Sequence, residues 1–397
     1  MKEINAYDIV HIRDYYPSKE NPASSPWVYD IVEGTQKKGI TTLVVSPNPF
    51  IPKFLRNKEK FALYPKPSNI IENYNNTYVV RPKYFKFPNN IFVEQNLFLL
   101  SKLISKKVLK YTKPKLIHAH FGQNGVAAVD LKRKLNIPLI TSFYGFDSGR
   151  LGEKFKPYYR KLIEYGDLFL ALSENMKLDL IKLGFPEKKI IIYHLGIKSE
   201  QFFPIEHNKL KFVFLVVARL DESKGVQDVI RAFSLISKQS MELRIIGTGK
   251  YKNKLIEIVK ELDMNDKVIF INNFKAENPR AVVVEEMQRC DVVLLTSFIT
   301  SNGGKEGTPV VLMEAQACGK PCIGTNHAGI PEVIIHDKTG FIVEEKDIKN
   351  IANKMIRLYE NDELRENMGR NALAHIEKQF NQNRQIIKLF EIYKKLI

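Results

Sequence analysis

A glycine-rich loop and the start of an apolar helix adjoin in SNGGKEGTPVVLMEAQACGKP, residues 301–321. Thr308 is a favoured N-cap and Pro309 a favoured first residue for the helix expected there. The free N–H groups at such a helix start, together with the helix dipole, form an anion site suited to a phosphate. Three glycines would let a ligand approach the backbone closely: Gly303, Gly304 and Gly307.

Two acids frame this helix start, Glu306 before it and Glu314 inside it. Eight helical residues rise about 12 Å, whereas the paired carboxyls of glycoside hydrolases lie about 5–9.5 Å apart. The spacing is therefore too wide for two acids that act on one glycosidic bond. It suits an extended ligand with hydroxyls at both ends and phosphates between them.

Arg219 and Lys224 lie in ARLDESKG, residues 218–225, directly after the apolar run at residues 211–217. Ligands of parallel α/β sheets bind at such strand ends. There the two cations would donate charge-assisted hydrogen bonds to a diphosphate, worth about 1.5–3 kcal/mol each. They would also offset the charge that develops as a diphosphate leaves. Alone, the pair would be read as solvated surface residues, so its assignment depends on the helix-start site.

Two further motifs are less specific. IIGTGKY, residues 245–251, lacks the third glycine of the dinucleotide fingerprint and is weak evidence for NAD. Its glycines would equally allow tight packing of a helix on a strand. IHAHFG, residues 117–122, ends an apolar strand and places His118 and His120 on one face. An ordinary buried histidine is the better interpretation for His118 and stays an alternative for His120.

The elements that would position these residues are short apolar runs alternating with amphipathic helical segments. Strands are predicted at 8–12, 41–45, 77–80, 116–120, 139–143, 168–172, 189–193, 211–217, 242–246, 267–271, 291–295, 321–324 and 340–343, with helices including 91–110, 226–237, 251–262 and 348–359. Apolar runs joined by helices indicate parallel strands buried on both faces. Because the pattern occurs twice, it predicts two Rossmann-like, doubly wound α/β domains with a break near Gln201–Lys209. Residues 47–76, rich in Pro and Asn, show no clear periodicity and suggest an irregular excursion.

Composition places the chain among globular proteins. It has 397 residues, 44% of them hydrophobic and 26% charged, enough for two domains with their own cores. No run approaches the length of a membrane helix, and no secretory signal is visible. The three cysteines, Cys290, Cys318 and Cys322, fit a reduced cytoplasm and are expected to be buried without a metal.

The net charge of +17 is concentrated in the first half of the chain. Residues 51–115 hold 14 Lys and Arg against 3 Asp and Glu. Such a patch would attract an anionic acceptor or anionic lipid headgroups, at about 1 kcal/mol per cation near a charged surface. A generally lysine-rich surface would look the same. Nucleic acid is disfavoured, because the patch carries no helix-turn-helix, zinc-finger or RRM signature.

Taken together, ARLDESKG, IIGTGKY, the acids Glu306 and Glu314, and GKPCIGTNHAGIPEVIIHDKTGFIV at residues 319–343 resemble glycosyltransferase family 4, retaining enzymes of the GT-B fold. The resemblance covers nearly all of residues 210–345. It is looser in the first half, where IHAHFG, TSFYGFD, LSENM and HLGI are similar to family elements.

The resemblance implies roles for individual residues. Arg219 and Lys224 would hold the diphosphate, Glu306 the donor hexose, and Glu314 the ribose hydroxyls, with His120 beside the reacting centre. The remaining donor-binding residues would be Gly247, Lys305, Gly307, Thr308 and Pro309.

Two departures from the family concern the acceptor side. Tyr144 stands where the family often has a histidine, and with an ordinary pKa near 10 it is a poor base. Asp147 is a candidate acceptor-site or histidine-orienting carboxylate. The first loop, Tyr16–Pro26, lacks the paired glycines common in the family, so acceptor details do not carry over.

The implied architecture has an acceptor-binding domain at 1–203, a donor-binding domain at 204–380, and a helix at 381–397 that crosses back to the first domain. The implied reaction moves a hexose-type sugar, with retention, from a UDP- or GDP-sugar to a hydroxyl of a saccharide or lipid-linked acceptor. It would run in a cleft that closes between the domains, with no cofactor and no metal, since fixed cations replace it. We expect a cytoplasmic enzyme of cell-surface polysaccharide, lipopolysaccharide or glycolipid synthesis, with peripheral attachment to the inner face of the membrane left open.

Two other functions use the same features. A sugar-nucleotide epimerase of GT-B fold would need no acceptor. A non-catalytic nucleotide-sugar-binding protein would bind tightly without turnover and would tolerate the loss of His120.

Overall fold

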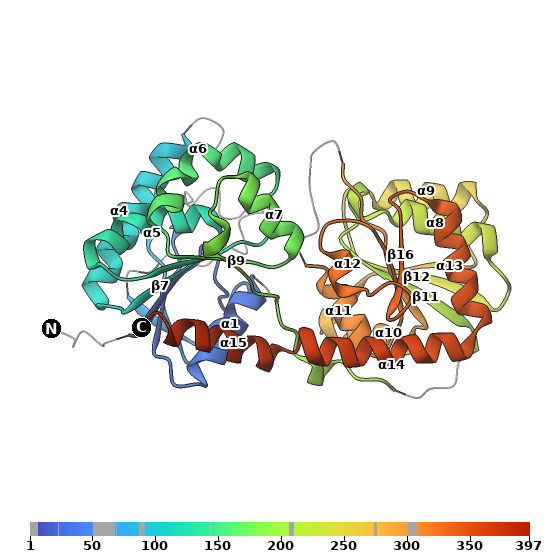
Figure 1. The fold of residues 1–397 in the computed structure, drawn as a ribbon. Coiled ribbons are helices and arrows are strands. Elements are labelled where there is room, and N and C mark those ends of the chain that lie inside the picture. The colour runs from blue at the N-terminus through green and yellow to red at the C-terminus, as the bar shows by residue number, and fades with distance from the viewer. Residues whose placement is uncertain are drawn as a thin grey trace. The chain divides into compact units, whose positions relative to one another are not determined.

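The computed structural model describes residues 7–22, 24–50, 68, 70–86, 92–145, 147–205, 210–273, 276–300 and 308–397. The chain divides into two compact units (Figure 1). Unit 1 comprises Met1–Leu172, Met176–Tyr193 and Gln385–Ile397, and unit 2 comprises Ser173–Asn175 and His194–Arg384.

Unit 1 is built on an eight-stranded sheet of order β10-β9-β8-β7-β1-β2-β5-β4. Its strands are β1 (Ile9–Ile12), β2 (Thr42–Val45), β4 (Ile71–Tyr74), β5 (Thr77–Val80), β7 (Leu116–His120), β8 (Leu139–Ser142), β9 (Leu168–Ala171) and β10 (Ile190–Ile192). All neighbours pair in parallel except β4 and β5, which form an antiparallel hairpin. A separate two-stranded ribbon joins β3 (Asn48–Pro49) to β6 (Lys83–Tyr84).

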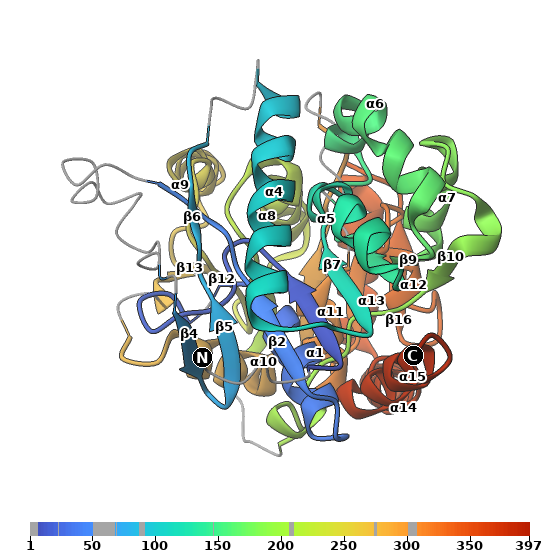
Figure 2. The same cartoon turned by 90° about the vertical axis from the view of Figure 1, so that its left-hand side faces the viewer.

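Helices cover both faces of this sheet, so its central strands are fully buried. The helices are α1 (Pro26–Gln36), α4 (Val93–Tyr111), α5 (Gly122–Leu135), α6 (Arg150–Tyr165), α7 (Glu174–Lys182) and α15 (Gln382–Lys394). One face packs against α1 and α15, through a core that includes Ile31, Ile386 and Leu389. Figures 1 and 2 show α4 and α5 on the opposite face.

Unit 2 has a wholly parallel six-stranded sheet of order β13-β12-β11-β14-β15-β16. Its strands are β11 (Phe212–Val217), β12 (Met241–Ile246), β13 (Val268–Ile271), β14 (Val292–Leu295), β15 (Cys322–Thr325) and β16 (Gly340–Val343). One face packs against α8 (Val226–Ile236), α9 (Lys252–Glu261) and α13 (Ile348–Glu360). The other packs against α10 (Pro279–Arg289), α11 (Val310–Ala317), α12 (Ile330–Val333) and α14 (Asp362–Gln379).

The predicted strands are confirmed, each within a residue or two of its predicted ends. The prediction for residues 47–76 was incomplete, because β3 and β4 form in this segment. These strands have few residues with an apolar pattern, so periodicity could not reveal them. The three cysteines are buried, as expected, and none of them forms a disulfide within the described part of the chain.

The break between units comes earlier than the predicted Gln201–Lys209. The chain already belongs to unit 2 from His194. The Ile197 N–H donates to the Phe380 carbonyl at 2.8 Å, and the Gln382 N–H donates to the Ile197 carbonyl at 3.0 Å. These bonds tie the segment after β10 to the end of α14. Helix α15 begins at Gln382, and from Gln385 onward its residues belong to unit 1. Over the described residues, no helix is both long and apolar enough to cross a bilayer.

Candidate functional site

Three histidines meet in unit 1 near the carboxyl ends of β1 and β7. His11 stands opposite His118 in the β1–β7 register, and His120 lies two residues further along the same face. All three side chains are fully buried. The His11 Nδ1 lies 2.9 Å from the His120 Nε2, and the His118 and His120 rings stack at 4.3 Å. The two histidines of IHAHFG are therefore joined in space by a third, His11, which we did not predict.

Hydroxyl groups complete this histidine cluster. The Tyr144 hydroxyl lies 2.7 Å from the His120 Nδ1. The two nitrogens of His118 face the Tyr393 hydroxyl of α15 at 2.5 Å and the Ser142 hydroxyl at 2.7 Å. His118, predicted to be an ordinary buried residue, is thus buried but hydrogen-bonded within the cluster. His120 has partners on both ring nitrogens.

Burial keeps the cluster uncharged. Desolvation lowers the pKa of His11 to about 3 and the pKa values of His118 and His120 well below their usual range. A neutral imidazole carries one N–H, so the contact between His11 and His120 makes one ring the donor and the other the acceptor. The tautomer of His120 in turn decides whether the Tyr144 hydroxyl donates or accepts. Burial also raises the pKa of that phenol, which keeps it protonated and able to donate.

Within the described residues, the Asp147 carboxylate contacts backbone N–H groups and not a histidine. Its carboxylate accepts the Gly122 N–H at 2.8 Å and the Tyr144 N–H at 2.9 Å. The residue is only 1% exposed, and its acceptor contact stays a prediction. Burial raises its pKa to about 6, although the backbone hydrogen bonds favour the ionised form. Asp147 therefore positions the loops after β7 and β8.

The backbone between β7 and α5 is strained at Phe121, which has φ 74° and ψ 141°. Residues with a side chain rarely adopt this region, which costs about 1–3 kcal/mol and is common at functional sites. The Arg13 guanidinium lies over the Phe121 ring at 4.3 Å. The Asn124 amide donates to Asp14 at 3.0 Å and to the His120 carbonyl at 2.7 Å. Sequence reasoning missed these polar residues, which border the histidine cluster.

The first loop lacks paired glycines, yet two residues at its ends have backbone conformations that glycine usually adopts. Tyr15 and Ser25 both have positive φ, at 58° and 50°, a region that glycine usually occupies. The Ser25 hydroxyl accepts from Arg13 at 2.6 Å. The serine therefore fixes the side chain of Arg13 at the strand end.

In unit 2 the predicted motifs follow three adjacent strands, β12, β11 and β14. The turn after β11 is tied to the turn after β12, since the Leu220 N–H donates to the Thr248 carbonyl at 2.9 Å. It is tied to the loop after β14 by the Thr296 hydroxyl, which donates to the Gly225 carbonyl at 2.9 Å. The structure therefore brings ARLDESKG, IIGTGKY and the loop after β14 together at the carboxyl ends of these strands.

The two predicted cations lie in the turn after β11. The Arg219 side chain is 73% exposed and pairs with Asp221. Lys224 ends a short 3-10 helix, Glu222–Lys224, that precedes α8. An exposed arginine beside a buried sheet edge is available to an anionic ligand.

Gly247 meets a packing requirement. A Cβ on Gly247 would lie 1.9 Å from the Ala218 carbonyl oxygen, and its φ is +144°. This geometry supports the alternative that the glycines of IIGTGKY allow close packing, here of two loops. It leaves the predicted donor contact of Gly247 as a prediction.

The start of α11 differs from the prediction. Pro309 stands at the N-cap and Val310 begins the helix, with no side chain capping it. The Thr308 hydroxyl was expected to cap the helix, but it is buried and has no hydrogen-bond partner among the described residues. Proline at the N-cap moves the helix start one residue along, so the threonine does not reach the free N–H groups. Lys305, Glu306 and Gly307 lie outside the described residues.

Glu314 is held by Arg280, a partner that we did not predict. The Glu314 side chain is 6% exposed, and the guanidinium of Arg280 contacts both of its oxygens. Burial raises the pKa of Glu314, and the positive charge of Arg280 partly offsets that effect. Arg280 lies in the first turn of α10, which Asn278 caps. A carboxylate offers about four acceptor positions, so this pairing leaves capacity for ribose hydroxyls.

The histidine cluster is the group of potential metal ligands that stands out among the described residues. Its ligand nitrogens lie within 4.8 Å of one another. A tetrahedral zinc with bonds of about 2.0–2.1 Å brings its nitrogens to about 3.4 Å. The rings would have to leave Tyr144, Tyr393 and Ser142 to close on an ion, so their spacing fits a hydrogen-bonded network better.

Two doubly wound sheets, each with candidate site residues at its strand ends, are typical of the GT-B fold. Residues 197–375 match the family model "Glycosyl transferases group 1" and residues 26–201 match "Glycosyltransferase Family 4". The amylovoran biosynthesis glycosyltransferase AmsK of Erwinia amylovora is 32% identical over 287 residues, which cover 70% of this chain and 69% of AmsK. The chain therefore belongs to the group 1 glycosyltransferases, family 4.

Solved structures agree with the fold. Sucrose-phosphate synthase of Thermosynechococcus elongatus has a TM-score of 0.76 at 17% identity. The superposition covers 98% of this chain and 99% of the synthase chain. HepE of Anabaena, solved with UDP, has a TM-score of 0.72 at 17% identity, with 98% and 100% coverage. At these identities the likeness shows the fold alone.

Proposed function

We propose that this glycosyltransferase moves a hexose-type residue, with retention, from a UDP- or GDP-sugar to a hydroxyl of a saccharide or lipid-linked acceptor. The observation that carries the proposal is the convergence of three loops at one edge of the unit 2 sheet. The name of AmsK supports a place in cell-surface polysaccharide synthesis, and the UDP in HepE supports a nucleotide donor.

On this proposal, unit 2 binds the donor. Arg219 and Lys224 hold the diphosphate, and their charge stabilises it as it leaves. Glu314, fixed by Arg280, accepts from the ribose hydroxyls. The Thr308 hydroxyl and the backbone at Pro309 contact phosphate and sugar at the start of α11. Glu306, Lys305, Gly307 and Gly247 complete the donor contacts.

Unit 1 contributes the acceptor side. His120 is fully buried, so we propose that it acts through the Tyr144 hydroxyl, which it orients at 2.7 Å. The protonated phenol donates a hydrogen bond to the sugar or acceptor. The leaving phosphate takes the proton of the attacking acceptor hydroxyl, the new glycosidic bond forms on the face that the phosphate leaves, and no metal is required.

Glu306 gives the test of this function. The Glu306→Ala variant should lose at least about 100-fold in kcat/KM for the correct donor, because a hydrogen bond to the transferred sugar strengthens in the transition state. Release of nucleoside diphosphate from a panel of UDP- and GDP-sugars, with and without acceptor, is the measurement. Undiminished turnover in a folded variant would contradict the proposal. Conversion of the donor into an isomeric nucleotide sugar, with no nucleoside diphosphate released, would favour an epimerase.

Membrane attachment is a further part of the proposal. Partial burial lowers the pKa of Lys107, and the like charges of Lys110 and Lys106 lower it further. Reversal of Lys102, Lys106 and Lys107 to Glu should weaken binding to anionic vesicles by about 100-fold or more, at about 1 kcal/mol per cation lost. Vesicle co-sedimentation measures this.

The matched control reverses three lysines of α9: Lys252, Lys254 and Lys260. It changes the net charge equally and should leave vesicle binding nearly intact. Equal effects of the two triple variants would mean that net charge, and not the α4 surface, drives attachment.

The buried histidines predict how stability depends on pH. The pKa of His11 is about 3 when folded and 6.5 ordinarily. Its contribution to the unfolding free energy is therefore present above pH 6.5 and is lost as pH falls, by about 1.4 kcal/mol per pH unit. His118 and His120 act in the same direction. Asp147 acts oppositely, because its raised pKa favours the folded state as pH falls from about 6 toward 3.8.

Urea unfolding at pH 7, 6 and 5, followed by the fluorescence of Trp27 in α1, reports on unit 1. The His11→Phe variant should lose about 1.4 kcal/mol per pH unit less than the wild type. Val44→Ala removes buried apolar atoms and no titrating group, so it should lower stability equally at each pH. A slope in His11→Phe that equals the wild-type slope would show that His11 is not buried in neutral form.

A further inference from the structure

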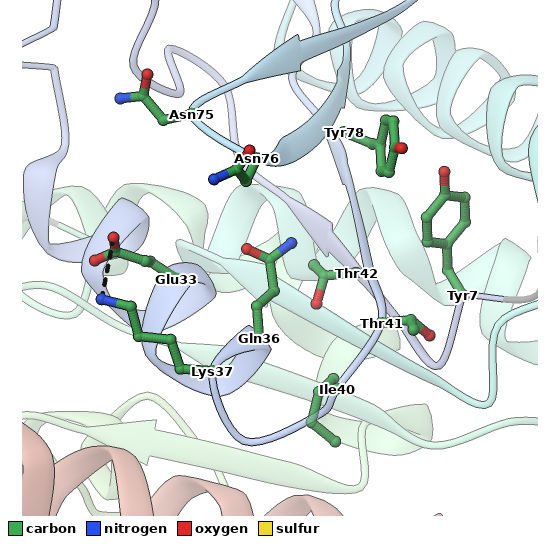
Figure 3. A pocket seen from close by; sticks show the side chains of 10 residues that line it. All are labelled: Tyr7, Glu33, Gln36, Lys37, Ile40, Thr41, Thr42, Asn75, Asn76 and Tyr78. Atoms are coloured by element: carbon green, nitrogen blue, oxygen red, sulfur yellow. Dashed lines mark ion pairs between the residues drawn. The ribbon is translucent and has the colours of Figure 1, made fainter.

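A hollow of about 380 Å³ opens in unit 1 (Figure 3). It lies away from the strand ends that carry the histidine cluster. Tyr7 precedes β1. Thr41 precedes β2, and Thr42 is its first residue. Asn75 and Asn76 form the turn before β5. These positions are at the amino ends of parallel strands, whereas His120 and Tyr144 follow the carboxyl ends. The hollow is therefore separate from the proposed transfer site.

The walls of the hollow are electrically neutral. Of its ten lining residues, Glu33 and Lys37 are the charged ones, and they form an ion pair at 3.3 Å. A nucleotide or a phosphate would meet no uncompensated cation among these ten lining residues. The charge balance favours an uncharged ligand.

Primary amides and hydroxyls project around the rim. Asn75 and Asn76 are exposed and both adopt positive φ, at 46° and 65°. The Asn76 N–H donates to the Asn73 side chain at 2.9 Å, which fixes the turn. The side-chain amide oxygen of Gln36, Oε1, accepts from the Thr77 hydroxyl at 3.2 Å, so the NH₂ group of the same side chain can donate to a ligand. Oriented amides of this kind can both donate to and accept from hydroxyl groups.

Two tyrosine rings form the remaining wall. The Tyr7 and Tyr78 rings lie 5.9 Å apart at 59°. Tyr7 is 6% exposed and anchored by its own N–H to the Thr112 hydroxyl at 3.2 Å. Tyr78 is 41% exposed, so its ring and hydroxyl are available. A sugar ring offers C–H faces to such rings and hydroxyls to the amides, and the volume lies in the lower range of small-molecule sites.

We propose that this hollow is a second saccharide-binding site, which holds a neutral stretch of acceptor or product glycan apart from the transfer site. The choice of a glycan as ligand rests on the proposed function, while the neutral, amide-rich chemistry rests on the hollow itself. Binding there would keep a growing chain on the enzyme between transfers and would raise the apparent affinity for long acceptors over short ones.

Two variants remove the binding groups and keep the fold. Tyr78→Ala deletes an exposed ring, and Asn76→Gly deletes an amide while tolerating the positive φ. The matched control is Phe98→Ala, which deletes a ring that is 55% exposed on α4. The probes are neutral oligosaccharides of glucose, galactose and N-acetylglucosamine, titrated by saturation-transfer NMR with saturating UDP and with saturating GDP present.

Wild type and Phe98→Ala should bind at least one oligosaccharide with equal affinity, and each hollow variant should weaken it about tenfold or more. Transfer to a short acceptor should be unchanged in all three variants. The proposal is overturned if no oligosaccharide binds the wild type, or if both hollow variants bind as tightly as the control. If the wild type binds an oligosaccharide but transfers no sugar to any acceptor, the proposed function is contradicted and the proposal of a second site is not.

Discussion

Replacing both Arg219 and Lys224 by Ala should lower kcat/KM by about 10²–10⁴. Each cation is assigned to the diphosphate, and a charge-assisted hydrogen bond is worth about 1.5–3 kcal/mol, so the pair accounts for about 3–6 kcal/mol. Part of this interaction exists only as the diphosphate leaves, so kcat should fall as well as donor affinity. Steady-state kinetics with varied donor separates the two effects.

A matched control removes two other exposed cations of unit 2. Arg231→Ala with Lys254→Ala deletes the same charge from α8 and α9, where the side chains are 44% and 50% exposed. Its kinetics should stay within about twofold of the wild type. If both double variants lose activity equally, general electrostatic attraction of the donor, rather than a specific diphosphate site, would explain the data.

The second large effect is expected from His120→Phe. The substitution removes the partner of the Tyr144 hydroxyl and of the His11 ring. We expect kcat to fall about 10²–10³, the effect of losing one positioned donor, with the donor KM within a few-fold of wild type. Tyr144→Phe, which deletes only the hydroxyl, should reproduce most of that loss.

Tyr393→Phe is the control for this prediction, because it deletes a hydroxyl that contacts His118 and leaves the contacts of His120 with Tyr144 and His11 in place. It perturbs the same cluster and should retain most of the activity. A His120→Phe variant with full turnover would contradict the assigned role and would agree with the non-catalytic alternative. A Tyr144→Phe variant with full turnover, beside an inactive His120→Phe, would place His120 itself against the substrate after a rearrangement.

Much of the fold follows from the sequence because each strand is a short apolar run that must be buried on both faces. The strand from Val213 to Val216, for example, is buried at every position. Strand β4 has no such pattern, because it pairs antiparallel at the sheet edge, where its residues are half exposed. Local periodicity predicts central strands and fails at edges.

The site was less predictable, because its key contacts join residues far apart in the chain. His11 meets His120 only because β1 pairs with β7 in the observed register, which no local pattern reveals. Tyr393 reaches His118 from the last helix, and Arg280 reaches Glu314 from the first turn of α10. What the sequence did reveal was the strand-end motifs, because glycines and cations leave a local signature.

The central claim is that the carboxyl edge of the unit 2 sheet, from the turn after β11 to the start of α11, holds the pyrophosphate of a nucleotide sugar. A crystal structure of the protein with UDP-glucose or GDP-mannose is the most direct measurement. We predict phosphate density between Arg219, Lys224 and the backbone at Pro309, with the nucleoside beside Glu314. Density for the nucleotide at another place, with these residues left in solvent, would contradict the account.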